Sequence, residues 1–364
     1  MKPKLIKMKL GKDSYSILIG NGLIKSLPAY LPKGISKIIV LSDVRLTAKR
    51  KELLSALKVL SIPVIEIPLK AGENLKNIKA VYPLYGKLLD AKADRDSLII
   101  AFGGGSIGDV AGFIAATYMR GIKWIGIPTT LLAQADSSVG GKTGINHDSG
   151  KNLIGAFYQP SLVLCDVAFL KSLGPREKIS GLGEVVKYAL AFDKKFFKWT
   201  HENISQLVKG SPDTLSVAIE KSLKWKAHLV SKDVYDRLGI REALNFGHTF
   251  GHALESGTNY KTFQHGEAVI WGMRFALCVS EIRGKLSASK KKQMDDLLAR
   301  FKVPAIPKTL SKNEIFKHMK RDKKAHGNTI RFVLLDDIGH SVSDAKVTQE
   351  NLDQAFYKLT GRKD

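Results

Sequence analysis

Apolar residues in the first half of the chain fall in short runs, and longer stretches of helical period separate these runs. Short apolar runs bounded by Gly, Pro or polar residues are typical of buried strands. The pattern predicts strands over residues 36–42, 63–69, 96–102 and 123–127, and helices over 46–59, 75–89 and 108–120. Strands that alternate with helices form a parallel sheet, which binds ligands at the carboxyl ends of its strands.

The pattern changes after Gly174, where helical periods dominate as far as Phe301. Only residues 329–335 look extended, and residues 351–359 predict a last helix. A length of 364 residues suits two domains. We therefore expect an α/β, Rossmann-like domain with a parallel sheet over residues 1–174 and a mostly α-helical domain over residues 175–364.

The composition, with 44% apolar and 25% charged residues, is that of an ordinary globular protein. Cys165 and Cys278 are the only cysteines, which gives no disulfide framework and fits a reducing compartment. The basic N-terminus lacks the apolar run of a signal peptide, and no apolar stretch reaches the roughly 18–20 residues of a membrane span. We expect a soluble cytoplasmic protein with no membrane partner.

The formal net charge of +24 allows two interpretations. Clustered Lys and Arg side chains bind nucleic acids, whereas a Lys-rich surface with a site for an anionic small molecule needs no such partner. Aromatic residues make up only 8% of the chain, and the Lys runs at 290–292 and 320–324 are scattered. We favour the second interpretation and expect no nucleic-acid partner, which salt-titrated binding to random duplex would test.

A glycine-rich loop, GGGSIGD over residues 103–109, follows the strand predicted at 96–102 and opens a helix. Glycines at this place let the backbone approach a pyrophosphate, which the helix N-terminus also favours. Two βα units precede the loop, unlike an ordinary dinucleotide fold, so a purely structural turn is the alternative. Thr129 and Thr130 end the next predicted strand, and their hydroxyls suit either a helix cap or a nucleotide contact.

Three histidines form a candidate metal and acid–base set with an upstream carboxylate. His248 and His252 are four residues apart and share one helix face, and His265 stands at a predicted helix start. Glu184 lies upstream, with Lys187 one turn later. One carboxylate and two imidazoles describe a catalytic zinc site, which would leave the third histidine for proton transfer. The alternative is a packed or surface histidine pair, which the spacing alone does not exclude.

Other basic and polar residues occur in apolar or Gly-rich contexts. Each alone is typical of a solvated surface, but together they suit a substrate with a carboxylate and a phosphate. They are Arg120, Asp136, Lys142, Lys151, Asn152, Lys226, Arg241 and Asn245.

With these residues in place, the chain resembles the 3-dehydroquinate synthase family nearly end to end. The resemblance is densest from Gly103 to Lys187 and from Arg241 to Met273. It rests on the segments GGGSIGDVAGFIAATYMRG, IPTTLLAQADSSVGGKTGIN, GKNLIGAF, GEVVKY, LNFGHTFGHALE and HGEAV.

The resemblance implies roles position by position. Glu184, His248 and His265 match the zinc ligands, and His252 matches the catalytic histidine. NAD-contacting positions correspond to Glu73, Lys76, Gly105, Ser106, Ile107, Gly108, Asp109, Thr129, Thr130, Lys142, Lys151, Phe169, Leu170, Lys171 and Ser172. Substrate-contacting positions correspond to Asp136, Lys142, Asn152, Lys187, Lys226, Arg241 and Asn245. Arg120 matches an arginine lent across a dimer interface to the substrate phosphate, and Lys323, or Lys324 in another register, matches a further phosphate ligand.

The implied activity is a carbon–oxygen lyase reaction of the shikimate pathway, which leads to aromatic amino acids. It converts 3-deoxy-D-arabino-heptulosonate 7-phosphate to 3-dehydroquinate and phosphate by transient oxidation, β-elimination, re-reduction and aldol closure. NAD is recycled in each turnover, and Zn²⁺ or Co²⁺ is the metal. The implied assembly is a homodimer.

The chain departs from the family pattern at a few positions. Gly183 replaces a common Ala, which predicts a helix weakened by at most about 1 kcal/mol. Ala71 replaces a common Asp, Arg45 a common Asn and Ser172 a Thr. Two related functions are the alternatives: a sugar-phosphate cyclase of the inosose or valiolone type, and a glycerol-dehydrogenase-like metal-dependent oxidoreductase.

Overall fold

A computed structural model describes residues 3–323, 331–344 and 347–364. Contacts within the chain define two compact units. The first unit comprises residues 1–173 and 212–235, and the second comprises residues 174–211 and 236–364. The division differs from the single boundary predicted at 174, because Pro212–Tyr235 groups with the first unit.

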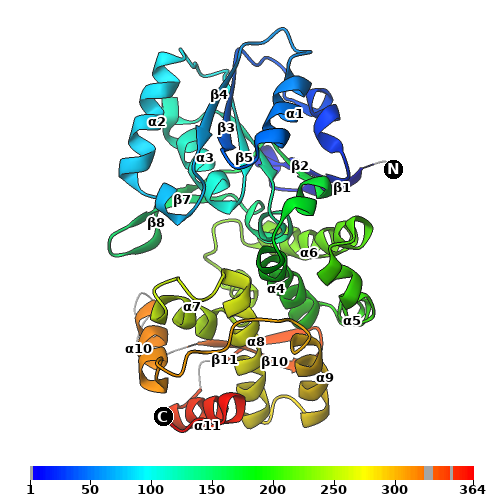
Figure 1. Cartoon of the computed structure of the whole chain (residues 1–364), viewed down its shortest axis with the longest axis vertical. Coiled ribbons are helices and arrows are strands. Elements are labelled where there is room, and N and C mark those ends of the chain that lie inside the picture. Colours follow the sequence, from blue (N-terminus) through cyan, green and yellow to red (C-terminus); the bar gives the residue numbers. More distant parts are fainter. Residues whose placement is uncertain (1–2, 324–330, 345–346) are drawn as a thin grey trace. The chain divides into compact units, whose positions relative to one another are not determined.

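The first unit is built on a seven-stranded sheet in the order β1-β2-β9-β6-β5-β3-β4 (Figure 1). All neighbouring strands are parallel except β1 and β2. The strands are β1 (Lys4–Met8), β2 (Tyr15–Gly20), β3 (Ile38–Asp43), β4 (Val64–Leu69), β5 (Leu98–Gly103), β6 (Lys123–Pro128) and β9 (Leu162–Asp166). The predicted parallel sheet is therefore confirmed.

Apolar residues of the central strands enter two cores, one on each face of the sheet. Ile39 and Leu41 join the core under α2 (Ile78–Asp90) and α3 (Gly105–Thr117), whereas Ile38 and Val40 join the core under α1 (Thr47–Leu57) and η2 (Leu23–Tyr30). Since alternate side chains of a strand point to opposite faces, strands buried on both faces read as continuous apolar runs.

Further elements complete the first unit. A hairpin of β7 (Lys142–His147) and β8 (Gly150–Phe157) packs on α3, and helix α6 (Pro212–Lys232) packs against β1, β2, η5 (Ala133–Ser137) and η6 (Val167–Ser172). Short helical turns connect the strands elsewhere. They are η1 (Gly11–Asp13), η3 (Glu73–Leu75) and η4 (Tyr118–Arg120).

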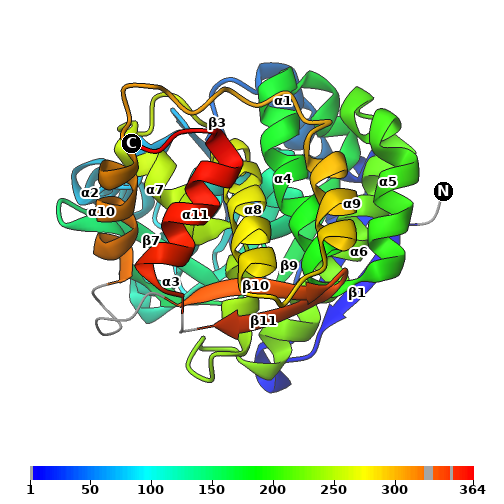
Figure 2. The ribbon, with the colours of Figure 1, turned by 90° about the horizontal axis from the view of Figure 1, so that it is seen from below.

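The second unit is mostly helical, as predicted, and α8 (His265–Ile282) is its central helix (Figure 2). Helices α4, α7, α9 and α11 and strand β10 all pack against α8. The helices are α4 (Pro175–Phe192), α5 (Lys194–Lys209), η7 (Ile240–Asn245), α7 (His248–Gly257), α9 (Ala288–Leu298), α10 (Lys312–Lys323) and α11 (Gln349–Thr360). An antiparallel pair, β10 (Phe332–Asp337) with β11 (His340–Asp344), completes it. None of the helices in the described parts of the chain is both long and apolar enough to cross a membrane.

Candidate functional site

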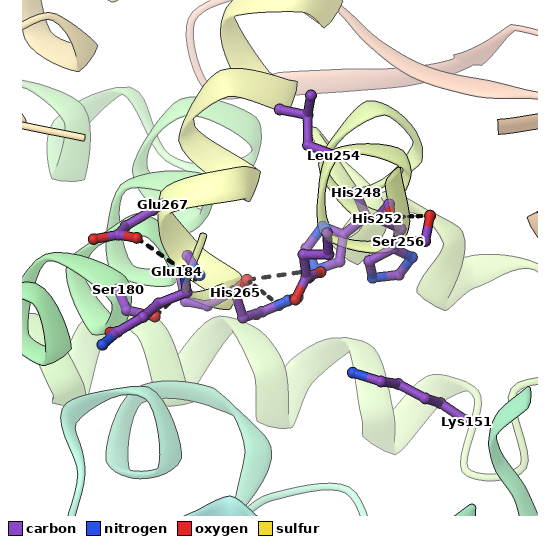
Figure 3. Close-up of polar contacts among 12 residues, drawn as sticks. Lys151, Ser180, Glu184, His248, His252, Leu254, Ser256, His265 and Glu267 are labelled. Atoms are coloured by element: carbon purple, nitrogen blue, oxygen red, sulfur yellow. Dashed lines mark hydrogen bonds and ion pairs between the residues drawn. The ribbon is translucent and has the colours of Figure 1, made fainter. Parts of the chain in front are cut away.

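Glu184, His248 and His265 meet in the second unit, each supplied by a different helix. Glu184 lies in the middle of α4, whereas His248 and His265 are the first residues of α7 and α8. The Nε2 atoms of His248 and His265 lie 3.4 and 3.3 Å from Oε1 of Glu184 (Figure 3). One ligand atom from each residue lies within 4.8 Å of the others. The predicted grouping of these three side chains is therefore present.

Glycines at the helix crossings allow this convergence. A Cβ on Gly266 would lie 1.7 Å from the carbonyl oxygen of Ser180, and a Cβ on Gly272 would lie 1.8 Å from that of Gly247. Only glycine fits where backbones approach so closely. Helices α4 and α7 therefore both reach α8 near the end that carries His265.

The first turn of α8 is fixed by polar contacts that the sequence analysis did not identify. Glu267 accepts a hydrogen bond from the backbone N–H of Gln264, 2.8 Å away, as in a capping box. Arg176 donates to both carboxylate oxygens of Glu267, at 2.8 and 2.6 Å. The Gln264 to Glu267 spacing is a readable cap signal, but the partner Arg176 is distant in sequence. These contacts hold His265 in place.

The charges of Glu184, His248 and His265 are set by burial and by neighbouring groups. Burial opposes ionisation of Glu184, but Lys187 and His248 hold the pKa of that carboxyl well below its usual range. Burial is the main cause that lowers the pKa of His248 to about 4. Burial also opposes a charge on His265, yet its contacts with Glu184 and Glu255 raise its pKa to about 10. At neutral pH the cluster thus holds a carboxylate, a neutral imidazole and an imidazolium.

The donor set fits a divalent cation. Both carboxylate oxygens of Glu184 are buried, and neither accepts a well-aligned hydrogen bond from the described residues, although Lys187 Nζ forms an ion pair with Oε2. Oε1 of Glu184 and the two imidazole Nε2 atoms that face it converge, and all three can donate an electron pair to a cation. One carboxylate and two imidazoles with a further position open are the ligands of a catalytic zinc site.

His252 lies one turn along α7 from His248, on the same face as predicted. Its ring centroid is 5.4 Å from that of His248 and 5.9 Å from that of His265. His248, His252 and Asn245 line a cavity of about 670 Å³, a size that suits a small ligand. His252 thus stands beside the three converging side chains and borders open space, which suits proton transfer.

Glu255 is a further member of this cluster that the sequence analysis missed. Its Oε2 lies 3.2 Å from Nδ1 of His265. The signal was readable, because positions 248, 252 and 255 fall on one face of a helix.

In the first unit, the glycine loop borders a pocket at the carboxyl end of β5. Gly103, Gly105, Gly108 and Asp109 line this pocket together with Lys142. Helix α3 begins at Gly105, three residues before the predicted start at 108. The chain passes from β3 out to β4 and returns to β5 on the other side of β3. Nucleotides bind beside such reversals in parallel sheets.

Several predicted nucleotide and substrate positions of the first unit lie together around Lys76. This side chain is buried, and its Nζ donates to Oδ2 of Asp109 at 2.6 Å and to Oδ1 of Asn152. Glu73 accepts a hydrogen bond from Asn146, which the sequence analysis missed, and pairs with Lys151 at 3.8 Å.

The remaining positions vary in exposure. Lys226 is buried and pairs with Asp136, with Nζ 3.0 Å from Oδ1. Phe169 and Leu170 have buried side chains, so any nucleotide contact there falls to their backbone. Buried residues in this set are Arg241, Thr129 and Ile107, the last of them in the core. Half-buried residues are Gly105, Ser106, Gly108 and Thr130. Exposed residues are Ser172, Lys171, Asn245, Lys142 and Arg120. Lys323 ends α10, but its side chain and all of Lys324 lie outside the described residues.

Family models match residues 66–325, and known proteins match nearly the whole chain. The model for the 3-dehydroquinate synthase N-terminal domain matches residues 66–180, and that for the C-terminal domain matches residues 181–325. A 3-dehydroquinate synthase from Haemophilus ducreyi is 38% identical over 98% of this chain and 99% of its own length. One from Acidithiobacillus ferrooxidans is 41% identical, with coverages of 95% and 96%.

Solved structures agree in fold. A 2-deoxy-scyllo-inosose synthase, complexed with carbaglucose-6-phosphate, NAD⁺ and Co²⁺, superposes with a TM-score of 0.88 at 26% identity, over 98% of this chain and 99% of that one. A glycerol dehydrogenase from Sinorhizobium meliloti shares only the fold, with a TM-score of 0.62 at 15% identity over 95% and 96% of the two chains. The chain belongs to the 3-dehydroquinate synthase family.

Proposed function

We propose that this chain is a 3-dehydroquinate synthase. It converts 3-deoxy-D-arabino-heptulosonate 7-phosphate to 3-dehydroquinate and phosphate, as a carbon–oxygen lyase of the shikimate pathway. The observation that carries the proposal is the convergence of Glu184, His248 and His265, with His252 one turn away. Relatives of that name at 38–41% identity over almost the full chain support it.

The proposed cofactors are NAD and a divalent ion, Zn²⁺ or Co²⁺. NAD⁺ and Co²⁺ are named in the inosose synthase complex that shares the fold. When bound, NAD takes up and returns a hydride, and the ion polarises a substrate oxygen. The nucleotide would bind beside the glycine loop at the carboxyl end of β5, and Glu184, His248 and His265 would hold the ion.

The side chains of this protein have separable tasks in the proposed reaction. Lys187 offsets the negative charge of buried Glu184 and keeps that carboxyl ionised. A ring nitrogen of His252 would accept and return a proton. The cationic and amide groups would orient the anionic substrate, with Arg241, Lys226 and Asn152 as the main candidates.

The deciding experiment measures phosphate release from the heptulosonate phosphate when the amount of NAD is smaller than the amount of substrate. Metal analysis is carried out on the same sample. Many turnovers per NAD without NADH accumulation are expected. Stoichiometric NADH formation with an alcohol substrate would instead indicate a dehydrogenase.

A second candidate is a cyclase that acts on another sugar phosphate. It is favoured by the TM-score of 0.88 to the inosose synthase complex. Parallel assays with a hexose 6-phosphate distinguish the two, because the proposed enzyme releases phosphate from the heptulosonate substrate alone.

The proposal includes a cytoplasmic homodimer in which Arg120 reaches the partner's substrate phosphate. Met119 is 40% exposed, and Met119 and Arg120 both have left-handed backbone conformations. The chain therefore forms an exposed corner just after α3. Light scattering tests the dimer. Mixed dimers of an Arg120→Ala chain with a His252→Ala chain would regain activity if Arg120 acts across the interface.

A further inference from the structure

Glu255 is a buried carboxylate that is not one of the three proposed metal ligands, Glu184, His248 and His265. It lies in the last turns of α7, and only 8% of the residue is exposed. Its Oε2 lies 3.2 Å from Nδ1 of His265, which belongs to a different helix. A carboxylate in such a dry place is costly unless it is paired, so this contact calls for an explanation.

The two ring nitrogens of His265 face different carboxylates. Nε2 lies 3.3 Å from Oε1 of Glu184, whereas Nδ1 faces Glu255. His248 shows the same arrangement, since its Nδ1 lies 3.2 Å from the backbone carbonyl oxygen of Phe246 and its Nε2 faces Glu184. Both rings therefore present Nε2 to the same point and hold Nδ1 against an acceptor.

An acceptor at Nδ1 has a defined effect on a histidine that binds a metal. It keeps the ring proton on Nδ1, leaves the Nε2 lone pair for the ion and fixes the ring orientation. A negatively charged acceptor also makes Nε2 more basic and therefore a stronger metal ligand. His248 obtains its acceptor from the backbone close to its own helix, but His265 depends on a side chain of α7.

We propose that Glu255 is a positioning residue that orients His265 toward the divalent ion held with Glu184 and His248. The proposal rests on the metal site of the proposed function. It goes beyond that site because it assigns a task to a residue outside the ligand set.

The cluster also permits another interpretation. Ligand atoms of His252, Glu255 and His265 lie within 4.8 Å of one another and form a second group that can hold an ion. That group would use Nδ1 of His265, which must then lose its proton while Nε2 binds the first ion. The positioning role needs no such double deprotonation, and it predicts one ion per chain.

The test compares Glu255→Ala and Glu255→Gln with the unchanged protein in the absence of substrate. Zinc affinity is measured by competition with a chromophoric chelator, and bound metal per chain by elemental analysis. Glu255→Ala is expected to bind zinc about 10–100-fold more weakly. Glu255→Gln should lose less, because its amide oxygen still accepts from Nδ1 but carries no charge.

Glu281→Gln is the matched control. Glu281 lies on α8 like His265, is largely buried and pairs with Lys358 at 2.8 Å, away from the cluster. Its variant should keep the zinc affinity of the unchanged protein.

Two results would overturn the proposal: unchanged zinc affinity in Glu255→Ala, or two ions bound per unchanged chain with one of them lost in that variant. If Glu255→Ala does not fold by circular dichroism, Glu255→Gln decides, with unchanged zinc affinity again counting against the role. Because no substrate is present, these results are independent of whether the chain releases phosphate from the heptulosonate.

Discussion

A Cβ placed on Gly183 would lie 2.5 Å from the carbonyl oxygen of Gly266. These glycines adjoin Glu184 and His265, so this contact sets the separation of α4 and α8 at the metal site. Helix propensity alone suggests that Gly183 costs α4 up to about 1 kcal/mol relative to Ala. Gly183 also allows the close packing of α4 on α8, because the backbone atoms of Gly266 opposite it cannot move aside as a flexible side chain would.

Gly183→Ala is therefore expected to destabilise the protein by about 1–3 kcal/mol, the usual cost of overpacking, despite its gain in helix propensity. It should also weaken zinc binding, since α8 must move away from Glu184. Urea unfolding and chelator competition measure the two effects.

Gly86→Ala is the control for this variant. Gly86 lies inside α2, and a Cβ there would meet nothing within 4 Å. Alanine should thus stabilise by up to about 1 kcal/mol. If Gly183→Ala stabilised the protein to the same extent, the close approach would not limit the packing.

Local sequence patterns predicted β3, β5 and β6, which are buried on both faces, but missed β9 (Leu162–Asp166), although all of its residues are buried. Residues 96–102, for example, correspond to β5 (Leu98–Gly103). Strand β1 (Lys4–Met8) was missed, since lysines alternate with its buried positions and conceal the apolar run. The grouping of α6 with the first unit depends on packing against β1, which no local pattern records.

The candidate site was predictable only in part. The spacing of His248 and His252 placed both on one helix face, and the structure confirms this arrangement. Spacing could not tell which ring faces Glu184, because that depends on how α4 and α8 cross α7. The family resemblance supplied the assignment, and the 3.4 Å contact between His248 Nε2 and Glu184 Oε1 agrees with it.

Replacement of His248 by Ala should remove the bound metal and the activity together. One of the two imidazoles that the described residues place against Glu184 would be lost, which leaves too few ligands for tight binding. Elemental analysis after dialysis measures the metal. A variant that retains stoichiometric zinc would contradict the ligand role.

His252→Ala should behave differently, because this ring stands beside the ligand set. Bound metal is expected to remain at the level of the unchanged protein, whereas turnover should fall by roughly 10²–10⁴-fold, the usual contribution of acid–base catalysis. Steady-state phosphate release and metal analysis on one sample separate the two effects. A near-normal rate would rule out proton transfer by His252.

Zinc binding should release about one proton at neutral pH. The pKa of His265 is raised to about 10, so the metal-free protein carries a proton on this ring that the ion must displace. The pKa of His248 is lowered to about 4, so that ring is already neutral and releases none. The apparent zinc affinity should therefore rise about tenfold per pH unit between pH 6 and pH 9.

The raised pKa of His265 makes the stability of the protein without zinc fall as the pH rises, whereas the zinc affinity rises. A pKa raised above the unfolded value of about 6.5 stabilises the fold fully below that pH, and this contribution is lost as the pH rises toward 10.

Calorimetric titration with zinc in buffers of different ionisation enthalpy counts the released protons. If no proton were released at pH 7, the metal-free site would hold His265 neutral, and its contacts with Glu184 and Glu255 would not stabilise an imidazolium.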